Sequence, residues 1–200
     1  MTSLARLLVA AALLATVACS GSSGGPDPGQ TIQPGPQHAK LVARAGLDPC
    51  PATPTATVDG GMPDLTLPCL GAGPAVHLAG LRGPLVVNMW GSWCVPCRKE
   101  MPFFAQVAGE LRSQVKFLGV DTDDRSDSAL DFVTHVRPRV RYPSVVDENK
   151  SALIGLRLAS AVPSTVFVDA AGRVVHKSLN SYTSVQQLRD DIEHYLGVTG

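Results

Sequence analysis

Short apolar runs alternate with amphipathic stretches through the last two thirds of the chain. Runs rich in β-branched residues predict strands, whereas apolar residues three or four positions apart predict helices. The expected strands cover residues 65–67, 76–78, 85–90, 115–120, 144–146, 165–169 and 173–178, and the expected helices cover 94–113, 126–136, 151–156 and 185–196. This order, β-α-β-α-β-α-β-β-α after an N-terminal hairpin, predicts an α/β layered domain.

The first eighteen residues have the pattern of a signal peptide. Arg6 precedes an apolar run over residues 7–17, which is too short to cross a hydrocarbon core of about 30 Å. The run ends in small residues before Cys19, and this ending resembles the lipobox of bacterial lipoproteins, in which the cysteine is acylated and becomes the first residue. We therefore expect a signal peptide over residues 1–18 and lipidation at Cys19. Ordinary secretion, with Cys19 discarded or left spare, is the alternative.

Glycine and proline dominate the next segment. They fill nine of the eighteen positions in residues 20–37, and such a composition cannot bury a core. The sequence predicts a lipidated flexible linker over residues 19–47 and one folded domain over residues 48–200. The 17 basic and 17 acidic side chains balance, which argues against a nucleic-acid-binding protein.

The cysteines indicate the chemistry. Cys94 and Cys97 form a C-x-x-C motif that follows a predicted strand and opens a predicted helix. The positive end of the helix favours a thiolate, which makes Cys94 the expected nucleophile, and Cys97, one turn later, the expected resolving thiol. Cys50 and Cys69 remain; because an exported chain meets oxidising surroundings, we expect them to form a structural disulfide, with two free thiols as the alternative.

Metal binding is the main rival for the C-x-x-C motif. A structural zinc site needs four ligands, and the five histidines have no ligand spacing between any two of them. The acidic stretch 121–127 lacks the glycine and the distal glutamate of a calcium loop, so we interpret it as a strand-to-helix loop. The sequence thus predicts neither a metal nor another cofactor.

The stretch 85–103, with its W-x-x-W-C-x-P-C motif, resembles the thioredoxin superfamily. It is most similar to the membrane-tethered bacterial TlpA/ResA/DsbE-like branch, whose lead-in is matched by residues 62–65 and 80–83 and whose cis-proline strand is matched by residues 161–169. The resemblance implies a thioredoxin-like fold, with a central mixed sheet flanked by helices and an N-terminal β-hairpin extension.

The same resemblance implies roles for particular residues. The Val162-Pro163 bond is expected to be cis and to face the dithiol, where Val162, Pro163, Trp93 and Pro96 form the substrate-binding surface. A trans proline opening an edge strand is the alternative.

Glu100 stands where the tethered reductases carry a glutamate, three residues after the second cysteine. The resemblance implies that it moves a proton to and from Cys97, because residues three apart share a helix face. A solvated glutamate in the first helical turns is the alternative.

These features predict an extracytoplasmic thiol-disulfide oxidoreductase, anchored to the bacterial cell membrane as a lipoprotein. It would take electrons from a membrane thiol carrier and reduce disulfides in exported proteins, and the resemblance implies apocytochrome c as one candidate. An exported oxidant that forms disulfides is the second hypothesis. A copper-binding chaperone of similar fold is the third, although that family typically uses C-x-x-x-C with a downstream histidine. A peroxidase is disfavoured because a lone peroxidatic cysteine in a threonine-rich loop is missing.

Overall fold

The computed structural model describes residues 35–159 and 161–199. The predicted signal peptide and Cys19 lie outside the described residues, and so does most of the predicted linker. The strands are β1 (Thr66–Leu67), β2 (Val76–His77), β3 (Leu85–Trp90), β4 (Lys116–Thr122), β5 (Ser144–Asp147), β6 (Ser164–Val168) and β7 (Val174–Ser178). The helices are α1 (Pro36–Ala45), the short 3-10 helix η1 (Leu78–Gly80), α2 (Val95–Glu110), α3 (Ser126–His135), α4 (Ser151–Gly155) and α5 (Val185–Leu196). No helix within these ranges is both long enough and apolar enough to cross a membrane.

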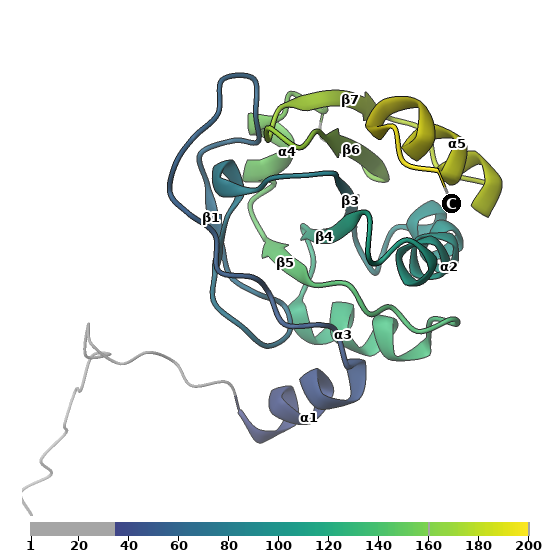
Figure 1. Cartoon of the computed structure of the whole chain (residues 1–200). Helices are drawn as coiled ribbons and strands as arrows, with labels where there is room; N and C mark the ends of the chain where they lie inside the picture. The colour runs from purple at the N-terminus through teal and green to yellow at the C-terminus, as the bar shows by residue number, and fades with distance from the viewer. Residues whose placement is uncertain (1–34, 160, 200) are drawn as a thin grey trace, which may run out of the picture. The chain divides into compact units, whose positions relative to one another are not determined.

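A five-stranded mixed sheet forms the centre of the domain, in the order β5-β4-β3-β6-β7 (Figure 1). Strands β3, β4 and β5 are parallel, whereas β6 runs antiparallel to β3 and β7 antiparallel to β6. The hairpin of β1 and β2 forms a separate two-stranded sheet. The predicted fold class and the predicted order of elements from the hairpin onward are confirmed.

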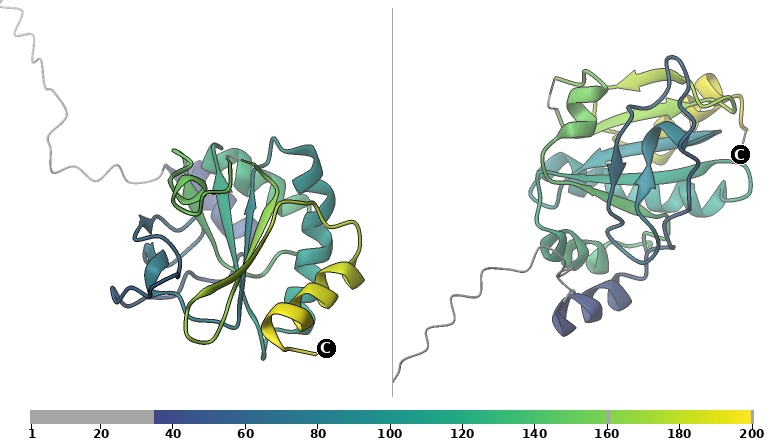
Figure 2. Two further views of the ribbon diagram at one scale, coloured as in Figure 1. Left: turned by 90° about the horizontal axis from the view of Figure 1, so that it is seen from above. Right: turned by 90° about the vertical axis from the view of Figure 1, so that its left-hand side faces the viewer.

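Two apolar layers cover the two faces of the sheet. Side chains of Val86 and Trp90 in β3 join the layer formed with α2, α3 and α5, whereas those of Leu85, Val87 and Met89 join the layer formed with α4 and the N-terminal hairpin. Figure 2 shows α2 and α5 on one side of the sheet and the N-terminal hairpin segment on the other. Strand β3 is buried along its whole length, because both of its faces are covered.

The prediction that residues 19–47 form a flexible linker is wrong over its last third. Residues 36–45 form α1, which lies against α3, and Ala45 and Leu47 are buried in the core. Pro36 opens this helix and Gly46 ends it in the left-handed conformation, which is a common combination of start and stop signals. The glycine and proline content of the preceding residues masked this short amphipathic pattern, and the domain therefore includes residues 36–47.

A disulfide joins Cys50 to Cys69, the pair that the sequence predicts. It connects the segment before β1 to the segment after it, and Cys69 also forms a β-bridge with Val145 of β5. The chain passes very close to this disulfide at Gly73, where an added Cβ would lie 2.7 Å from the backbone N and O of Cys50. Glycine is therefore required at position 73. The disulfide ties the two parts of the N-terminal segment together, and the bridge of Cys69 with Val145 joins this segment to the central sheet.

The packing of α1 gives a test of the corrected domain boundary. Leu41 packs against the core, whereas Ala39 on the same helix is exposed. We expect Leu41→Asp to lower the free energy of unfolding by about 1–2 kcal/mol, since roughly half of a leucine's burial is lost. The matched control Ala39→Asp, which introduces the same charge, should have little effect. Equal stability of the two variants in urea unfolding would contradict a packed α1.

Candidate redox site

The dithiol lies where the central strand β3 passes into α2. Cys94 is the N-cap residue of α2, its Sγ accepts the Cys97 backbone N–H at 3.2 Å, and the two cysteines are joined by a disulfide. Cys94 is 3% exposed and Cys97 is fully buried, so that in the oxidised state only Cys94 is in contact with solvent. Once the disulfide is reduced, the positive end of α2 stabilises a thiolate on Cys94.

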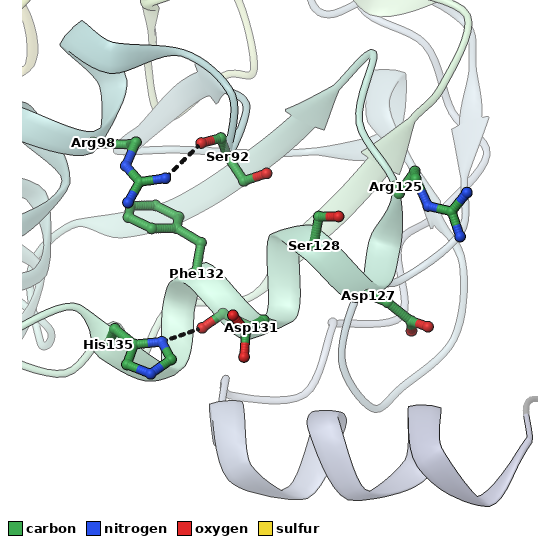
Figure 3. Close-up of a pocket in the computed structure, with 8 residues that line it drawn as sticks. All are labelled: Ser92, Arg98, Arg125, Asp127, Ser128, Asp131, Phe132 and His135. Carbon is green, nitrogen blue, oxygen red and sulfur yellow. Dashed lines mark hydrogen bonds between the residues drawn. The ribbon is translucent and has the colours of Figure 1, made fainter.

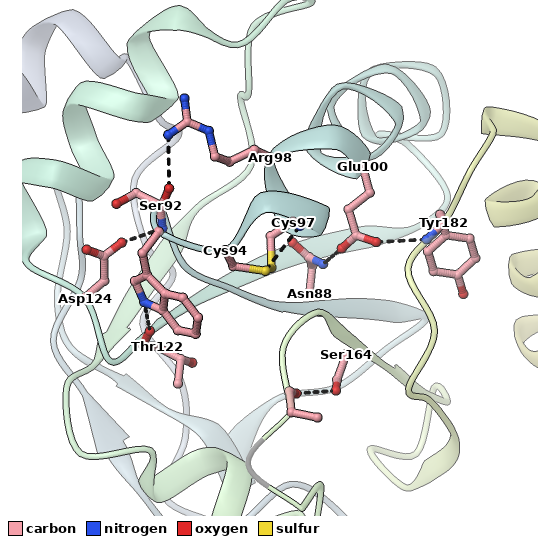
Figure 4. Close-up of a disulfide and its surroundings, with 12 residues drawn as sticks. Asn88, Ser92, Cys94, Cys97, Arg98, Glu100, Thr122, Asp124, Ser164 and Tyr182 are labelled. Atoms are coloured by element: carbon pink, nitrogen blue, oxygen red, sulfur yellow. Dashed lines mark hydrogen bonds between the residues drawn. A yellow bond between two sulfur atoms is a disulfide. The ribbon is translucent and has the colours of Figure 1, made fainter.

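Hydrogen bonds fix the turn before the dithiol from two sides (Figure 4). The Ser92 N–H donates to Asp124 Oδ2 at 2.5 Å, and Arg98 Nη1 donates to the Ser92 carbonyl at 3.2 Å. The guanidinium of Arg98 also lies over the ring of Phe132 in α3, 5.0 Å from its centroid, at the edge of a polar hollow shown in Figure 3. The turn is thus held by α3 and by the loop after β4.

The two tryptophans of the motif have different positions. Trp90 is fully buried and its ring centroid lies 5.9 Å from that of Phe132. Trp93 is 53% exposed and donates its indole N–H to the Thr122 carbonyl at 3.3 Å. Together with the exposed Val95, Trp93 forms an apolar surface beside Cys94, whereas Trp90 belongs to the core.

Glu100 is fully buried in α2, one turn after Cys97. One of its carboxyl oxygens accepts the side-chain N–H of Asn88 and the other accepts the backbone N–H of Tyr182, both at 2.9 Å (Figure 4). Burial raises the pKa of Glu100 to about 7, and these two hydrogen bonds oppose the rise. The structure therefore excludes the alternative of a solvated glutamate and brings to the dithiol an acid that titrates near neutral pH.

The Val162-Pro163 bond is cis, and it precedes β6. Because Ser164 pairs with Met89 in the antiparallel ladder, Pro163 lies across from the end of β3, where the dithiol turn begins. Val162 is half-buried against both core layers. The register therefore brings the cis proline to the same edge as the dithiol, although these elements are far apart in the sequence.

Asp121 is a buried acid that sequence reasoning missed. The expected loop over residues 121–127 begins later in the structure, because β4 continues through Asp121 and Thr122. Both residues are buried. Among the described residues, neither carboxyl oxygen of Asp121 has a hydrogen-bond partner. Burial, followed by the nearby acids Asp124 and Glu148, raises the pKa of Asp121 to about 9. Its position directly after an apolar central strand was the signal that pointed to burial.

No group of three or more histidine, cysteine, aspartate or glutamate side chains arranged to hold a metal ion occurs within residues 35–159 and 161–199.

Comparisons with known proteins show what the chain is similar to. The family model described as "AhpC/TSA family" matches residues 58–177, a range that includes Cys94, Cys97 and Pro163. Thiol-disulfide oxidoreductase ResA of Bacillus cereus is 28% identical over 126 residues, which are 62% of this chain and 68% of ResA. Thiol:disulfide interchange protein HelX of Rhodobacter capsulatus is 34% identical over 127 residues, 62% of this chain and 69% of HelX. The crystal structure of a DsbF homologue from Corynebacterium diphtheriae superposes with a TM-score of 0.58 at 27% identity, covering 72% of this chain and 96% of that one.

Replacement of Glu100 tests its part in proton transfer. We expect Glu100→Gln to remove the step near pH 7 from the pH profile of thiol-disulfide exchange and to slow the exchange by about 100-fold, a common contribution of a positioned acid or base. Stopped-flow measurement with a small disulfide from pH 5 to 9 gives the profile. Glu110→Gln, at an exposed position of the same helix, is the control. A profile of Glu100→Gln that keeps the step would exclude this role.

The buried carboxyl of Asp121 predicts a pH dependence of stability. Its pKa in the folded chain, about 9, exceeds the ordinary value of 3.8, so the folded state binds the proton more tightly. The free energy of unfolding should therefore fall as the pH rises from about 4 to about 9, by at most about 1.4 kcal/mol per pH unit for this one group. Asp121→Asn should flatten this decline, whereas Glu148→Gln, at an exposed position, should keep most of it. Urea unfolding at pH 5, 7 and 9 measures the slopes, and equal slopes for wild type and Asp121→Asn would refute the prediction.

Proposed function

This chain belongs to the AhpC/TSA family and is a thiol-disulfide oxidoreductase, and we propose that it reduces disulfides in exported proteins outside the cytoplasmic membrane. Apocytochrome c is one candidate substrate, by the resemblance to the tethered reductases. A membrane thiol carrier would restore the dithiol, and lipid at Cys19 would hold the protein at the membrane.

The reduction proceeds by two exchange steps. The Cys94 thiolate attacks one sulfur of the substrate disulfide, which forms a mixed disulfide and releases the first substrate thiolate. Cys97 then loses its proton to the Glu100 carboxylate and attacks Cys94 Sγ. This step releases the second substrate thiolate and leaves the Cys94–Cys97 disulfide. Two electrons pass from the enzyme dithiol to the substrate, and the two substrate thiolates take up the two protons that the dithiol gives up.

The surroundings of the dithiol support a reductant over an oxidant. A strong oxidant needs a stabilised reduced form, usually a stabilised thiolate. Here the carboxylate of Asp124 is hydrogen-bonded two residues before Cys94, and Glu100 lies one turn beyond Cys97. The cation of Arg98 is directed to the Ser92 carbonyl and the Phe132 ring. These carboxyl groups on both sides of the turn oppose the stabilisation that the positive end of α2 gives the Cys94 thiolate, and this is the observation that carries the proposal.

The reduction potential of the Cys94–Cys97 couple decides between the two directions. We expect a value near or below that of thioredoxin, about −270 mV, when the protein is equilibrated with dithiothreitol buffers. A value nearer −120 mV would reject the reductant and make the protein an exported oxidant.

The variant Cys97→Ser serves as the control for the mechanism. It cannot close the internal disulfide, so exchange should stop at the mixed disulfide, which mass spectrometry would detect. Cys94→Ser should form no mixed disulfide. A Cys97→Ser variant that turns over normally would exclude the two-step exchange. A wild-type protein without any exchange activity would also exclude it, and would favour the copper-binding chaperone.

A further inference from the structure

Five arginines and one lysine lie at the end of the domain that is remote from the dithiol. All six are exposed, and we call them the basic pole: Arg44, Arg112, Lys116, Arg137, Arg139 and Arg141. The dithiol follows the carboxyl end of β3, whereas the basic pole lies at the amino ends of β4 and β5 and at the last turns of α1 and α2. Because β3, β4 and β5 are parallel, these are opposite edges of one sheet.

The members of the basic pole form one continuous surface. Arg44, Arg137 and Arg139 line a hollow of about 270 Å³ between α1 and the end of α3. The other three line a second hollow of about 290 Å³, whose remaining walls are largely apolar. One arginine of each hollow lies near Gly46, since a Cβ placed there would lie 3.5 Å from Arg139 Nη1 and 3.8 Å from Arg141 Nη1.

The charges of the basic pole are not balanced locally. Within the described ranges, none of its six cations has a carboxylate within 4 Å. Arg137 and Arg141 donate only to backbone carbonyls, those of Thr134, Val136 and Gly46. Asp48 lies beside Arg141 through a backbone hydrogen bond, but its carboxylate forms no ion pair with another residue of the described ranges. In a chain whose formal net charge is zero, these cations form a local excess that is free to meet an anion.

We propose that the basic pole docks on an anionic lipid surface. Clustered guanidinium groups are attracted to such a surface over about a Debye length, some 8–10 Å in physiological salt. The apolar walls of the hollow between Arg112, Lys116 and Arg141 suit the region of a lipid below its headgroup. The predicted acyl chain at Cys19 would bring the domain to the same surface.

The chain before α1 is long enough for this arrangement. Sixteen residues, 20–35, separate Cys19 from Pro36, and they span at most about 58 Å when fully extended. Helix α1 has ten residues and is about 15 Å long, so Arg44 at its end is within that reach. Docking then leaves the dithiol edge facing away from the lipid, open to exported proteins. Exchange with a membrane carrier requires undocking, which a reversible electrostatic attachment permits.

Vesicle co-sedimentation tests the proposal. The probe is vesicles of phosphatidylcholine alone or mixed with phosphatidylglycerol in equal parts. The protein is residues 19–200, the predicted mature chain, with Cys19→Ser so that no acyl chain contributes. We expect binding to the anionic vesicles only, with loss of binding at high salt. Each basic residue at such a surface contributes about fivefold to the partition, so Arg139→Glu with Arg141→Glu should weaken binding by at least about 25-fold.

A charge-matched pair separates docking from net charge. The double variant Arg125→Glu with Arg157→Glu makes the same change of charge at the dithiol edge and should keep most of the vesicle binding. The double variant Arg44→Glu with Arg112→Glu changes the basic pole and should lose the vesicle binding. The thermal unfolding temperature and the rate of exchange with dithiothreitol should be the same in all variants. These measurements do not depend on vesicle binding, so a failure of the proposed redox function is distinguished from a failure of docking. Equal binding to neutral vesicles, equal loss in the Arg125/Arg157 pair, or binding to acidic proteins but not to lipid would each overturn the proposal.

Discussion

The complete burial of β3 is the constraint on which the redox site depends. This strand is covered on both faces and paired on both edges, so its register is strongly specified: a slip by one residue would move every side chain to the opposite layer. The register places Asn88 beneath Glu100, brings Pro163 to the end of the strand, and starts the dithiol turn at Gly91. An indole lies over Gly91, where an added Cβ would be 2.7 Å from Trp93 Nε1, so a larger residue at this position would displace the Trp93 side chain.

Buried carboxyl groups are the second organising feature of the site. Glu100 and Asp121 both lie in the layer between the sheet and α2, and burial is the largest cause of the raised pKa of each. A buried acid without a cationic partner lowers stability at neutral and alkaline pH. Glu100 is held by two hydrogen bonds one helical turn beyond Cys97, whereas Asp121 lies close to Asp124 in the loop that holds the dithiol turn. The site thus combines reactivity with a stability loss, a combination that is common where function requires polar groups in a core.

The domain has two chemically different ends, and the parallel strands separate them. The carboxyl edge carries the dithiol, the cis proline and the exposed apolar Trp93 and Val95, while the opposite edge carries cations without acidic partners. Helix α1 runs beside α3 between these edges, with His38 hydrogen-bonded to Asp127 at one end and Arg44 beside Arg137 at the other. This helix therefore extends from one end of the domain to the other.

The amino-acid sequence alone predicts the order of the elements from the hairpin onward, the position of Cys94 at the start of a helix and the pairing of Cys50 with Cys69. The order of the elements and the position of Cys94 follow from the period of the hydrophobic residues and from the turn residues between the runs. The pairing of the cysteines follows from their number and from the oxidising compartment. Helix α1 had such signals in Pro36 and Gly46, but the surrounding glycine and proline hid them. Tertiary packing, in contrast, buries Glu100 and Asp121, places Asp124 and Arg98 on two sides of Ser92, and gathers six cations at one end of the domain. These features depend on which distant segments pack together. Those segments, rather than the neighbours of a residue in the chain, provide the environment that shifts a pKa or brings several cations to one end of the domain.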